Sequence, residues 1–218
     1  MSERNEQIDA ISKNEKTKGV FMNVKLSMVI AFILSLSFQA NLYAEVKTEK
    51  AILAAGCFWG VEESFRKIPG VIKTQVGYTG GKTSHPKYED MHDGKTGHAE
   101  SVEIIFDPTK VSFNELMNHF YKMHDPTTLN RQGNDVGSQY RSAIFYTSDA
   151  QKKLAQEFKI KVDKSKAWKS PVVTEILEAS VFWPAEEYHQ KYLIKNPGGY
   201  DNHYMRNISF EAKEKLKK

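Results

Sequence analysis

ILAAGCFWGVEESFRK, residues 52–67, is the stretch on which the interpretation of the whole chain depends. Its first four residues are apolar and predict a short buried strand, and Gly56 predicts a turn. Apolar side chains then recur at helical spacing from Phe58 to Phe65. The stretch therefore predicts a strand that turns directly into a helix, with Cys57 at the junction.

Cys57 is the single cysteine of the chain, so it forms no internal disulfide. A lone cysteine without further context is usually a small buried side chain. A thiol at a helix N-terminus, however, faces unpaired N–H groups and the positive end of the helix dipole, which favour the thiolate. We therefore interpret Cys57, placed before a helix over 58–67, as a nucleophile.

Apolar patterns predict the remaining elements. Residues 100–106 alternate apolar and polar side chains, as a half-buried strand does. Ser112 and Glu115 form a capping box that opens a helix with an apolar side. Further strands are predicted over 72–78, 140–146 and 172–179, a further helix from Ser148 to about Lys161, and two long polar loops over 82–98 and 124–139.

The order strand, helix, strand, strand, helix, strand matches a split βαβ unit. We therefore predict an α+β fold with a ferredoxin-like core, in which helices pack on one face of a mixed or antiparallel sheet. A polar loop as long as 82–98, which carries Tyr88, often carries function. Residues 45–218 are expected to form one domain.

The first 44 residues have the pattern of a leader with a signal peptide. Lys25 precedes the apolar run 26–38, and Ala44 ends a plausible cleavage site. The 13 residues of this run fall short of the roughly 20 that a membrane-spanning helix needs. We therefore expect cleavage after Ala44, export to the periplasm or medium, and no stable membrane anchor. Met22 is an alternative start.

Charge excludes one class of partner. The chain of 218 residues has a formal net charge of +4, and loss of residues 1–44 lowers it to +3. So small an excess does not indicate nucleic-acid binding. The lysine-rich tail 213–218 is interpreted as a solvated, frayed helix end.

Three segments resemble one family. GCFWG at 56–60, GHAE at 97–100 and GNDVGSQYR at 133–141 are similar to the signatures of the A-type peptide methionine sulfoxide reductases. The resemblance runs from about residue 52 to 200. It implies an oxidoreductase that repairs oxidised methionine by reducing the S epimer of its sulfoxide.

The resemblance also implies roles for particular residues. Sulfoxide reduction needs a thiolate, a proton for the oxygen and hydrogen-bond donors around that oxygen. By resemblance, the nucleophile is Cys57, the acid Glu100, the hydroxyl donors Tyr88 and Tyr140, the supporting acceptor Asp135, and the apolar walls around the substrate methyl group Phe58 and Trp59.

Each of these residues has a plainer interpretation. Glu100 alone would be an exposed carboxylate at a strand edge, and it serves as an acid only if burial keeps it protonated near neutral pH. Tyr88 and Tyr140 alone would be ordinary half-buried side chains. Trp183 and His189 are candidates to line the same region, but they receive no role, since core packing explains both.

Regeneration requires an external thiol. The attack leaves a sulfenic acid on Cys57. Many relatives carry a second cysteine near the C-terminus, whereas residues 199–203 read GYDNH. We therefore expect a thioredoxin-like protein or a small thiol as the reductant. We expect no cofactor or metal, oxidised proteins, peptides and free methionine sulfoxide as substrates, and a monomer.

Three alternatives stay open. Cys57 paired with His98 would be a cysteine hydrolase. Cys57 with His85, His92 and Glu100 would be a metal site, although the spacing matches no zinc pattern. A binding module would recognise oxidised methionine through aromatic residues without reducing it. Turnover with a thiol separates that module from an enzyme.

Overall fold

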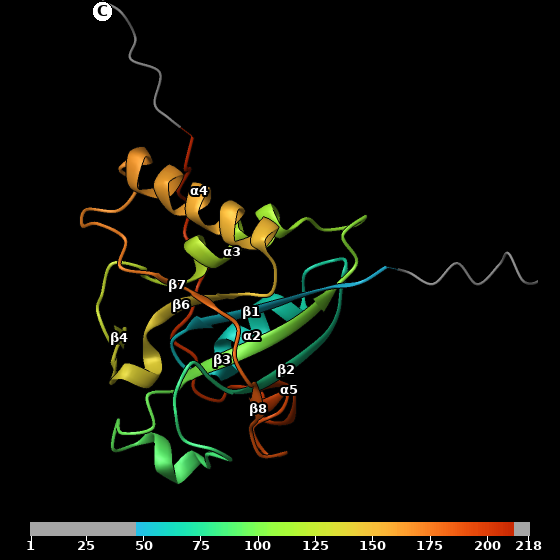
Figure 1. Ribbon diagram of the computed structural model, residues 1–218, viewed down its shortest axis with the longest axis vertical. Coiled ribbons are helices and arrows are strands. Elements are labelled where there is room, and N and C mark those ends of the chain that lie inside the picture. The colour runs from blue at the N-terminus through green and yellow to red at the C-terminus, as the bar shows by residue number, and fades with distance from the viewer. Residues whose placement is uncertain (1–46, 212–218) are drawn as a thin grey trace, which may run out of the picture. The chain divides into compact units, whose positions relative to one another are not determined.

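The computed structural model describes residues 47–211, so the predicted leader and lysine-rich tail lie outside the described residues. Four long strands and three long helices form the main body (Figure 1). They are β1 (Glu49–Ala55), α2 (Phe58–Arg66), β2 (Val71–Thr79), β3 (Ala99–Phe106), α3 (Phe113–Met123), β6 (Ser142–Tyr146) and α4 (Asp149–Ser165). The shorter elements are β4 (Arg131–Gln132), β5 (Asp135–Val136), β7 (Glu175–Glu178), β8 (Trp183–Pro184), α5 (Tyr192–Lys195) and 3₁₀ turns at Tyr88–Met91 and Ser138–Tyr140.

The sheet has the order β7-β6-β1-β3-β2-β8. β3 lies between β1 and β2 and is antiparallel to both, and β6 is antiparallel to β1. These four strands and the two helices that connect them form the predicted split βαβ core. β7 pairs with β6 in parallel, which makes the sheet mixed. The predicted fold class is confirmed.

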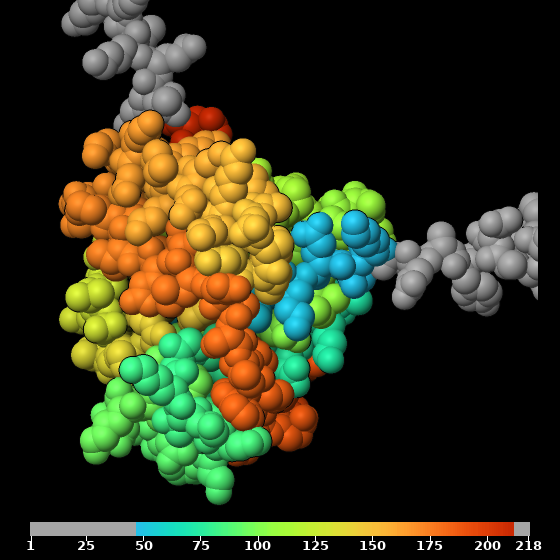
Figure 2. Space-filling view, viewed as in Figure 1, coloured from blue at the N-terminus to red at the C-terminus, as the bar shows by residue number. Residues whose placement is uncertain are grey.

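The two faces of the sheet are covered differently. Along β1, Ala51, Leu53 and Ala55 point into the main core, which they share with the apolar sides of α2, α3 and α4. Ile52 and Ala54 point to the opposite face. There the segment that follows β7 crosses the strands, and Figure 2 shows it as an orange ridge that runs down to the green loop between β2 and β3. The helices therefore pack on one face, as predicted.

Side-chain caps lie at the starts of α3 and α4. Ser112 Oγ accepts the Glu115 N–H at 3.2 Å, and the Glu115 carboxylate accepts the Ser112 N–H at 2.7 Å. Ser148 Oγ accepts the Gln151 N–H at 3.3 Å. Each cap satisfies N–H groups that have no partner within the helix.

Two predicted strands begin later than their apolar patterns indicated. Tyr140 belongs to the 3₁₀ turn, and β6 begins only at Ser142. Gly137, at φ 149°, allows this turn, and the Tyr140 N–H bonds the Gly137 carbonyl instead of a neighbouring strand. The strand predicted over 172–179 is shorter too, because the Val173 N–H bonds Pro126 in a loop and not the sheet. Residue patterns do not report such pairings.

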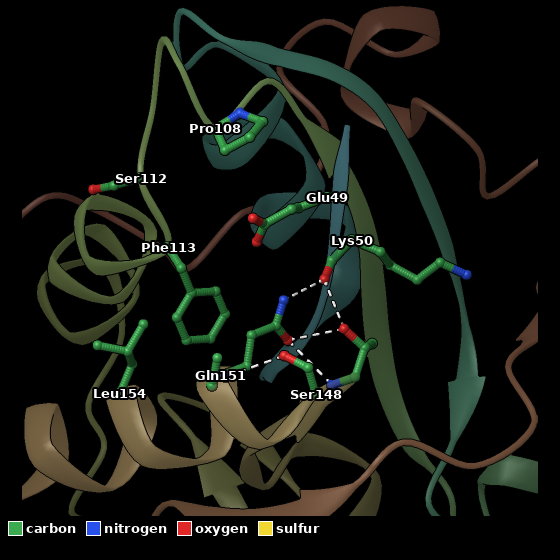
Figure 3. A pocket seen from close by; sticks show the side chains of 10 residues that line it. Glu49, Lys50, Pro108, Ser112, Phe113, Ser148, Gln151 and Leu154 are labelled. Atoms are coloured by element: carbon green, nitrogen blue, oxygen red, sulfur yellow. Dashed lines mark hydrogen bonds between the residues drawn. The ribbon is translucent and has the colours of Figure 1, made fainter. Parts of the chain in front are cut away.

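A cavity of about 480 Å³ lies at the end of β1 that is distant from Cys57 (Figure 3). The start of α3 and the start of α4 form its walls. Gln151 Nε2 donates to the Lys50 carbonyl at 2.7 Å, and the Thr147 hydroxyl donates to the same carbonyl at 3.2 Å. Its polar groups thus bond one another and tie α4 to β1.

Within residues 47–211, none of the helices is long and apolar enough to cross a membrane.

Candidate active site

A cavity of about 170 Å³ opens where β1 passes into α2. The structure brings together in its wall all seven residues that the sequence predicted for the site, although they come from five separate segments. The lining residues are Cys57, Phe58, Trp59, Tyr88, Glu100, Asp135, Tyr140 and, unpredicted, Tyr200.

Cys57 lies at the start of α2, as predicted, and is 8% exposed. Gly56 makes the preceding turn at φ 101°, a conformation that favours glycine. Burial raises the pKa of the Cys57 thiol far above its usual value, and the Glu100 carboxylate raises it further. A hydrogen bond from the Trp59 backbone N–H lowers it, but not enough to compensate. The sequence favoured a thiolate at this position, whereas in the folded chain desolvation outweighs the helix N-terminus and favours the thiol.

Glu100 is the second residue of β3 and is 2% exposed. Burial raises the pKa of this carboxyl to about 8, although the hydrogen bond from the Phe58 N–H lowers it; Asp135 raises it slightly. The carboxyl therefore stays largely protonated near neutral pH. This fulfils the burial condition that an acid role requires.

Two aromatic side chains form the apolar wall. The Trp59 indole N–H donates to His189 Nδ1 at 3.0 Å, and its ring stacks on Tyr192 with centroids 3.7 Å apart. The Phe58 ring lies 5.1 Å from the His189 ring and 5.8 Å from that of Tyr78. His189 thus lies behind the wall and orients it. From the sequence, His189 was a candidate to line this region but received no role.

The two tyrosines come from different loops. Tyr88 begins a 3₁₀ turn inside the long loop between β2 and β3, and its backbone N–H donates to Glu186 at 3.0 Å. Tyr140 ends the 3₁₀ turn before β6. Burial raises the pKa of both hydroxyls, and the Glu100 carboxylate raises both further. Both groups are therefore neutral O–H donors at ordinary pH.

Asp135 is held by residues that follow α5. The Tyr200 hydroxyl donates to Asp135 Oδ1 at 2.9 Å, and Asn202 Nδ2 donates to Oδ2 at the same distance. Burial, together with the hydrogen bond to Asp135 and the charge of that carboxylate, raises the pKa of Tyr200 to about 12. The sequence analysis missed Tyr200 and Asn202. The sequence signal for these two residues was weak, because residues 199–203 had been considered only for the absence of a second cysteine.

This C-terminal segment packs directly on the turn that carries Cys57. His203 Nε2 donates to the Ala55 carbonyl at 2.7 Å, and His203 Nδ1 lies 3.1 Å from Asp201 Oδ1. A Cβ added to Gly60 would overlap both Asp201 and His203. The second glycine of GCFWG is therefore required by a segment more than 140 residues away, and not by the turn itself.

The geometry also bears on two alternatives. His98 is 2% exposed; its Nδ1 accepts the Gly81 N–H at 3.0 Å and its Nε2 donates to the Thr83 carbonyl at 2.7 Å. With both ring nitrogens occupied, it is not a base for Cys57, and the hydrolase interpretation loses its partner. Across residues 47–211, no group of three or more His, Cys, Asp or Glu side chains is placed to hold a metal ion.

Known proteins agree with these motifs. The family model described as peptide methionine sulfoxide reductase matches residues 49–218. Peptide methionine sulfoxide reductase MsrA of Methanothermobacter thermautotrophicus is 55% identical over 149 residues, 68% of this chain and 88% of that protein. The MsrA of Nocardia farcinica is 50% identical over 159 residues, 73% of this chain and 91% of its own.

Solved structures agree as well. Methionine sulfoxide reductase A of Corynebacterium diphtheriae matches with a TM-score of 0.68 and 40% identity, over 76% of this chain and 83% of its own. Reduced Mxr1 of Saccharomyces cerevisiae matches with a TM-score of 0.70 and 38% identity, over 75% and 95%. Mxr1 in complex with Trx2 matches with a TM-score of 0.51 and 27% identity, over 75% and 94%. The chain belongs to the peptide methionine sulfoxide reductase family.

Proposed function

We propose that this enzyme, a peptide-methionine (S)-S-oxide reductase, transfers the sulfoxide oxygen to Cys57 with Glu100 as the acid. The Cys57 sulfur bonds to the sulfoxide sulfur while Glu100 protonates the oxygen, and the Cys57 proton passes to the Glu100 carboxylate. The oxygen then passes to the Cys57 sulfur: a Cys57 S–O bond forms while the methionine S–O bond and the new S–S bond break. Methionine leaves reduced by two electrons, and Cys57 is left as a sulfenic acid, oxidised by two. The observation that carries this proposal is a buried, largely protonated Glu100 in the same small cavity as Cys57.

The other lining residues fit the proposal. The Tyr88 and Tyr140 hydroxyls are neutral donors in the cavity wall, where they would stabilise charge on the sulfoxide oxygen. Phe58 and Trp59 offer apolar ring faces to the methyl group, and such faces contact sulfur-bearing chains favourably. Asp135, fixed by Tyr200 and Asn202, would accept a hydrogen bond from the substrate or hold the cavity in shape.

An external thiol completes the cycle. A thiolate attacks the Cys57 sulfenic acid, a mixed disulfide forms and water leaves; a second thiol releases Cys57. Mxr1 has been solved in complex with Trx2, which supports a thioredoxin-like reductant here too. No prosthetic group is needed for either step. One chain supplies every lining residue of the cavity, which supports a monomer as the working form. The proposed substrates are both protein-bound and free methionine sulfoxide.

Export remains part of the proposal. The basic flank at Lys25, the apolar run 26–38 and the small residue Ala44 support a cleaved signal peptide and a periplasmic or secreted enzyme. N-terminal sequencing of the protein recovered outside the cytoplasm should find Glu45 first. A product that begins at Met1 or Met22 and stays in the cytoplasm would contradict export and leave the chemistry untouched.

The chemistry is tested with residues 45–218, dithiothreitol and the two separated methionine sulfoxide epimers. The S epimer alone should turn over, and Cys57→Ser should abolish turnover. A probe that reacts with sulfenic acids and not with thiols should label the wild type after one turnover without reductant. A folded protein that binds the sulfoxide but reduces neither epimer would be a binding module and would overturn the catalytic assignment.

A further inference from the structure

The loop between β2 and β3 is closed at its neck by one buried histidine. Both ring nitrogens of His98 bond the opposite side of the neck, Nδ1 to the Gly81 N–H at 3.0 Å and Nε2 to the Thr83 carbonyl at 2.7 Å. These two bonds require the neutral tautomer with hydrogen on Nε2. The backbone of Lys82 and Thr96 adds one bond of 3.0 Å. The neck is thus fixed where the loop leaves and re-enters the sheet.

One buried arginine ties this neck to the second tyrosine-bearing segment. Arg141 Nη2 donates to the Gly97 carbonyl at 3.1 Å, next to His98, and Nη1 donates to the Ser138 carbonyl at 2.9 Å, in the turn that ends at Tyr140. Its Nε bonds Glu175 at 3.2 Å, which holds the guanidinium against β7. The side chain is buried, so these bonds are protected from water.

Two adjacent glycines lie against this histidine and arginine. A Cβ on Gly81 would overlap the backbone and ring of His98, and a Cβ on Gly80 would press on the Phe145 ring and approach Arg141 Nη2 to 3.1 Å. Gly80 also takes φ 79°. Both glycines therefore make room for the histidine and the arginine. The four residues form one unit, which we call the neck clamp: Gly80, Gly81, His98 and Arg141.

We propose that His98 and Arg141 are positioning residues, which set the spacing of Tyr88 and Tyr140 so that both hydroxyls reach one sulfoxide oxygen. The inference rests on the proposed role of these hydroxyls as donors. Outside the neck, the loop is anchored by the bond from the Tyr88 N–H to Glu186 and by Met91, which is buried in the main core. Loss of the neck clamp would let the hydroxyl drift, and a shift of about 1 Å costs up to roughly a hundredfold in rate.

A double-mutant cycle tests this proposal. The measured quantity is the single-turnover rate of methionine formation at saturating S-sulfoxide without reductant. Tyr88→Phe should lower this rate roughly 100-fold and His98→Ala about 10-fold, with KM within about threefold of wild type. Because His98 acts through Tyr88, the double variant should be about as slow as Tyr88→Phe alone.

Two further variants guard against a loss of folding. His98→Asn keeps an acceptor for the Gly81 N–H but does not reach Thr83, so it should be slowed less than His98→Ala. His85→Ala removes an exposed ring from the same loop and should keep the wild-type rate. Should His98→Ala not fold, the cycle is run with His98→Asn. Arg141→Lys loses the pair of bonds to the Ser138 and Gly97 carbonyls. This substitution should lower the rate by a larger factor in the wild type than in the double variant Tyr88→Phe/Tyr140→Phe.

The outcomes test the neck clamp and the donor roles of the tyrosines separately. Multiplicative losses in the double variant, or a wild-type rate in folded His98→Ala, would overturn the neck clamp and leave the tyrosine roles standing. A wild-type rate in Tyr88→Phe would overturn both the donor role of Tyr88 and the inference built on it.

Discussion

The Glu100 carboxyl and the Phe58 backbone are joined by a hydrogen bond of 3.1 Å from the Phe58 N–H to Glu100 Oε2. Phe58 follows Cys57 directly, so this bond ties the proposed acid to the first turn of the helix that begins at Cys57. It also partly opposes burial, which raises the pKa of Glu100 to about 8. The result is an acid that is buried, oriented and still able to lose its proton.

The chemical step should weaken in alkali. The Cys57 thiol has the higher pKa, so Glu100 loses its proton first as pH rises. Glu100 is almost fully protonated below about pH 7 and loses its proton as the pH rises through about 8. We therefore expect the single-turnover rate to be level near pH 6 to 7 and to fall about tenfold per pH unit well above 8. A rate that climbs steadily from pH 7 to 10 would instead identify Cys57 ionisation as limiting.

Replacing the acid should stabilise the fold while it abolishes chemistry. The folded pKa of Glu100 is above its unfolded value, so the folded state binds the proton more tightly and loses stability as pH rises through the interval between them. Glu100→Gln keeps an acceptor for the Phe58 N–H without the buried charge. It should gain on the order of 2 kcal/mol over wild type at pH 8.5 but little at pH 4.5. Urea unfolding at both pH values measures this, and equal differences would contradict the buried-charge explanation.

Gly60→Ala should destabilise the enzyme although alanine favours helices. The added Cβ would overlap Asp201 and His203. We expect a loss of about 2 kcal/mol, against a helix-propensity gain of about 1 kcal/mol at a site with free space. Limited proteolysis should cut the displaced segment near Tyr200 faster. In the Asp201→Ala background the cost should shrink, and an unchanged cost would mean that the glycine is needed for another reason.

Trp59→Phe should weaken substrate binding more than chemistry. The change removes the N–H that His189 accepts and reduces the ring face stacked on Tyr192. We expect KM for methionine S-sulfoxide to rise about tenfold, while the saturated single-turnover rate stays within about threefold. Trp168→Phe is the matched control, since Trp168 packs beneath Arg206 and does not line the cavity. A fall in the saturated rate without a change in KM would assign Trp59 to the transition state.

Loss of the α3 cap should lower stability without changing kinetics. Ser112→Ala removes the side chain that accepts the Glu115 N–H and should cost about 1 kcal/mol. Ser148→Ala, which removes the single bond to the Gln151 N–H, should cost a similar or smaller amount. Both positions lie by the cavity of Figure 3 and away from Cys57. A change in kcat/KM with either variant would show that this end of β1 influences the active site.

Local patterns in the sequence determined the α+β class, the split βαβ order, the capping box at Ser112 and the strand-turn-helix that presents Cys57. Each depends on spacing, caps or turn residues within a few positions, so one stretch of chain is enough to read it. Three short motifs likewise predicted six residues of the cavity wall, and the family resemblance added Tyr88 from the long loop 82–98. Glu100 needed burial that its motif could not itself provide.

Tertiary structure alone decided the remainder. Burial of Cys57 reversed the expected ionisation of its thiol, since desolvation depends on every segment packed around it. The contact of His203 with the Cys57 turn and the bonds of His98 and Arg141 join positions far apart along the chain. Side-chain periodicity shows which face of a helix or strand is apolar. It does not show which distant polar group will form a hydrogen bond with that element in the folded chain.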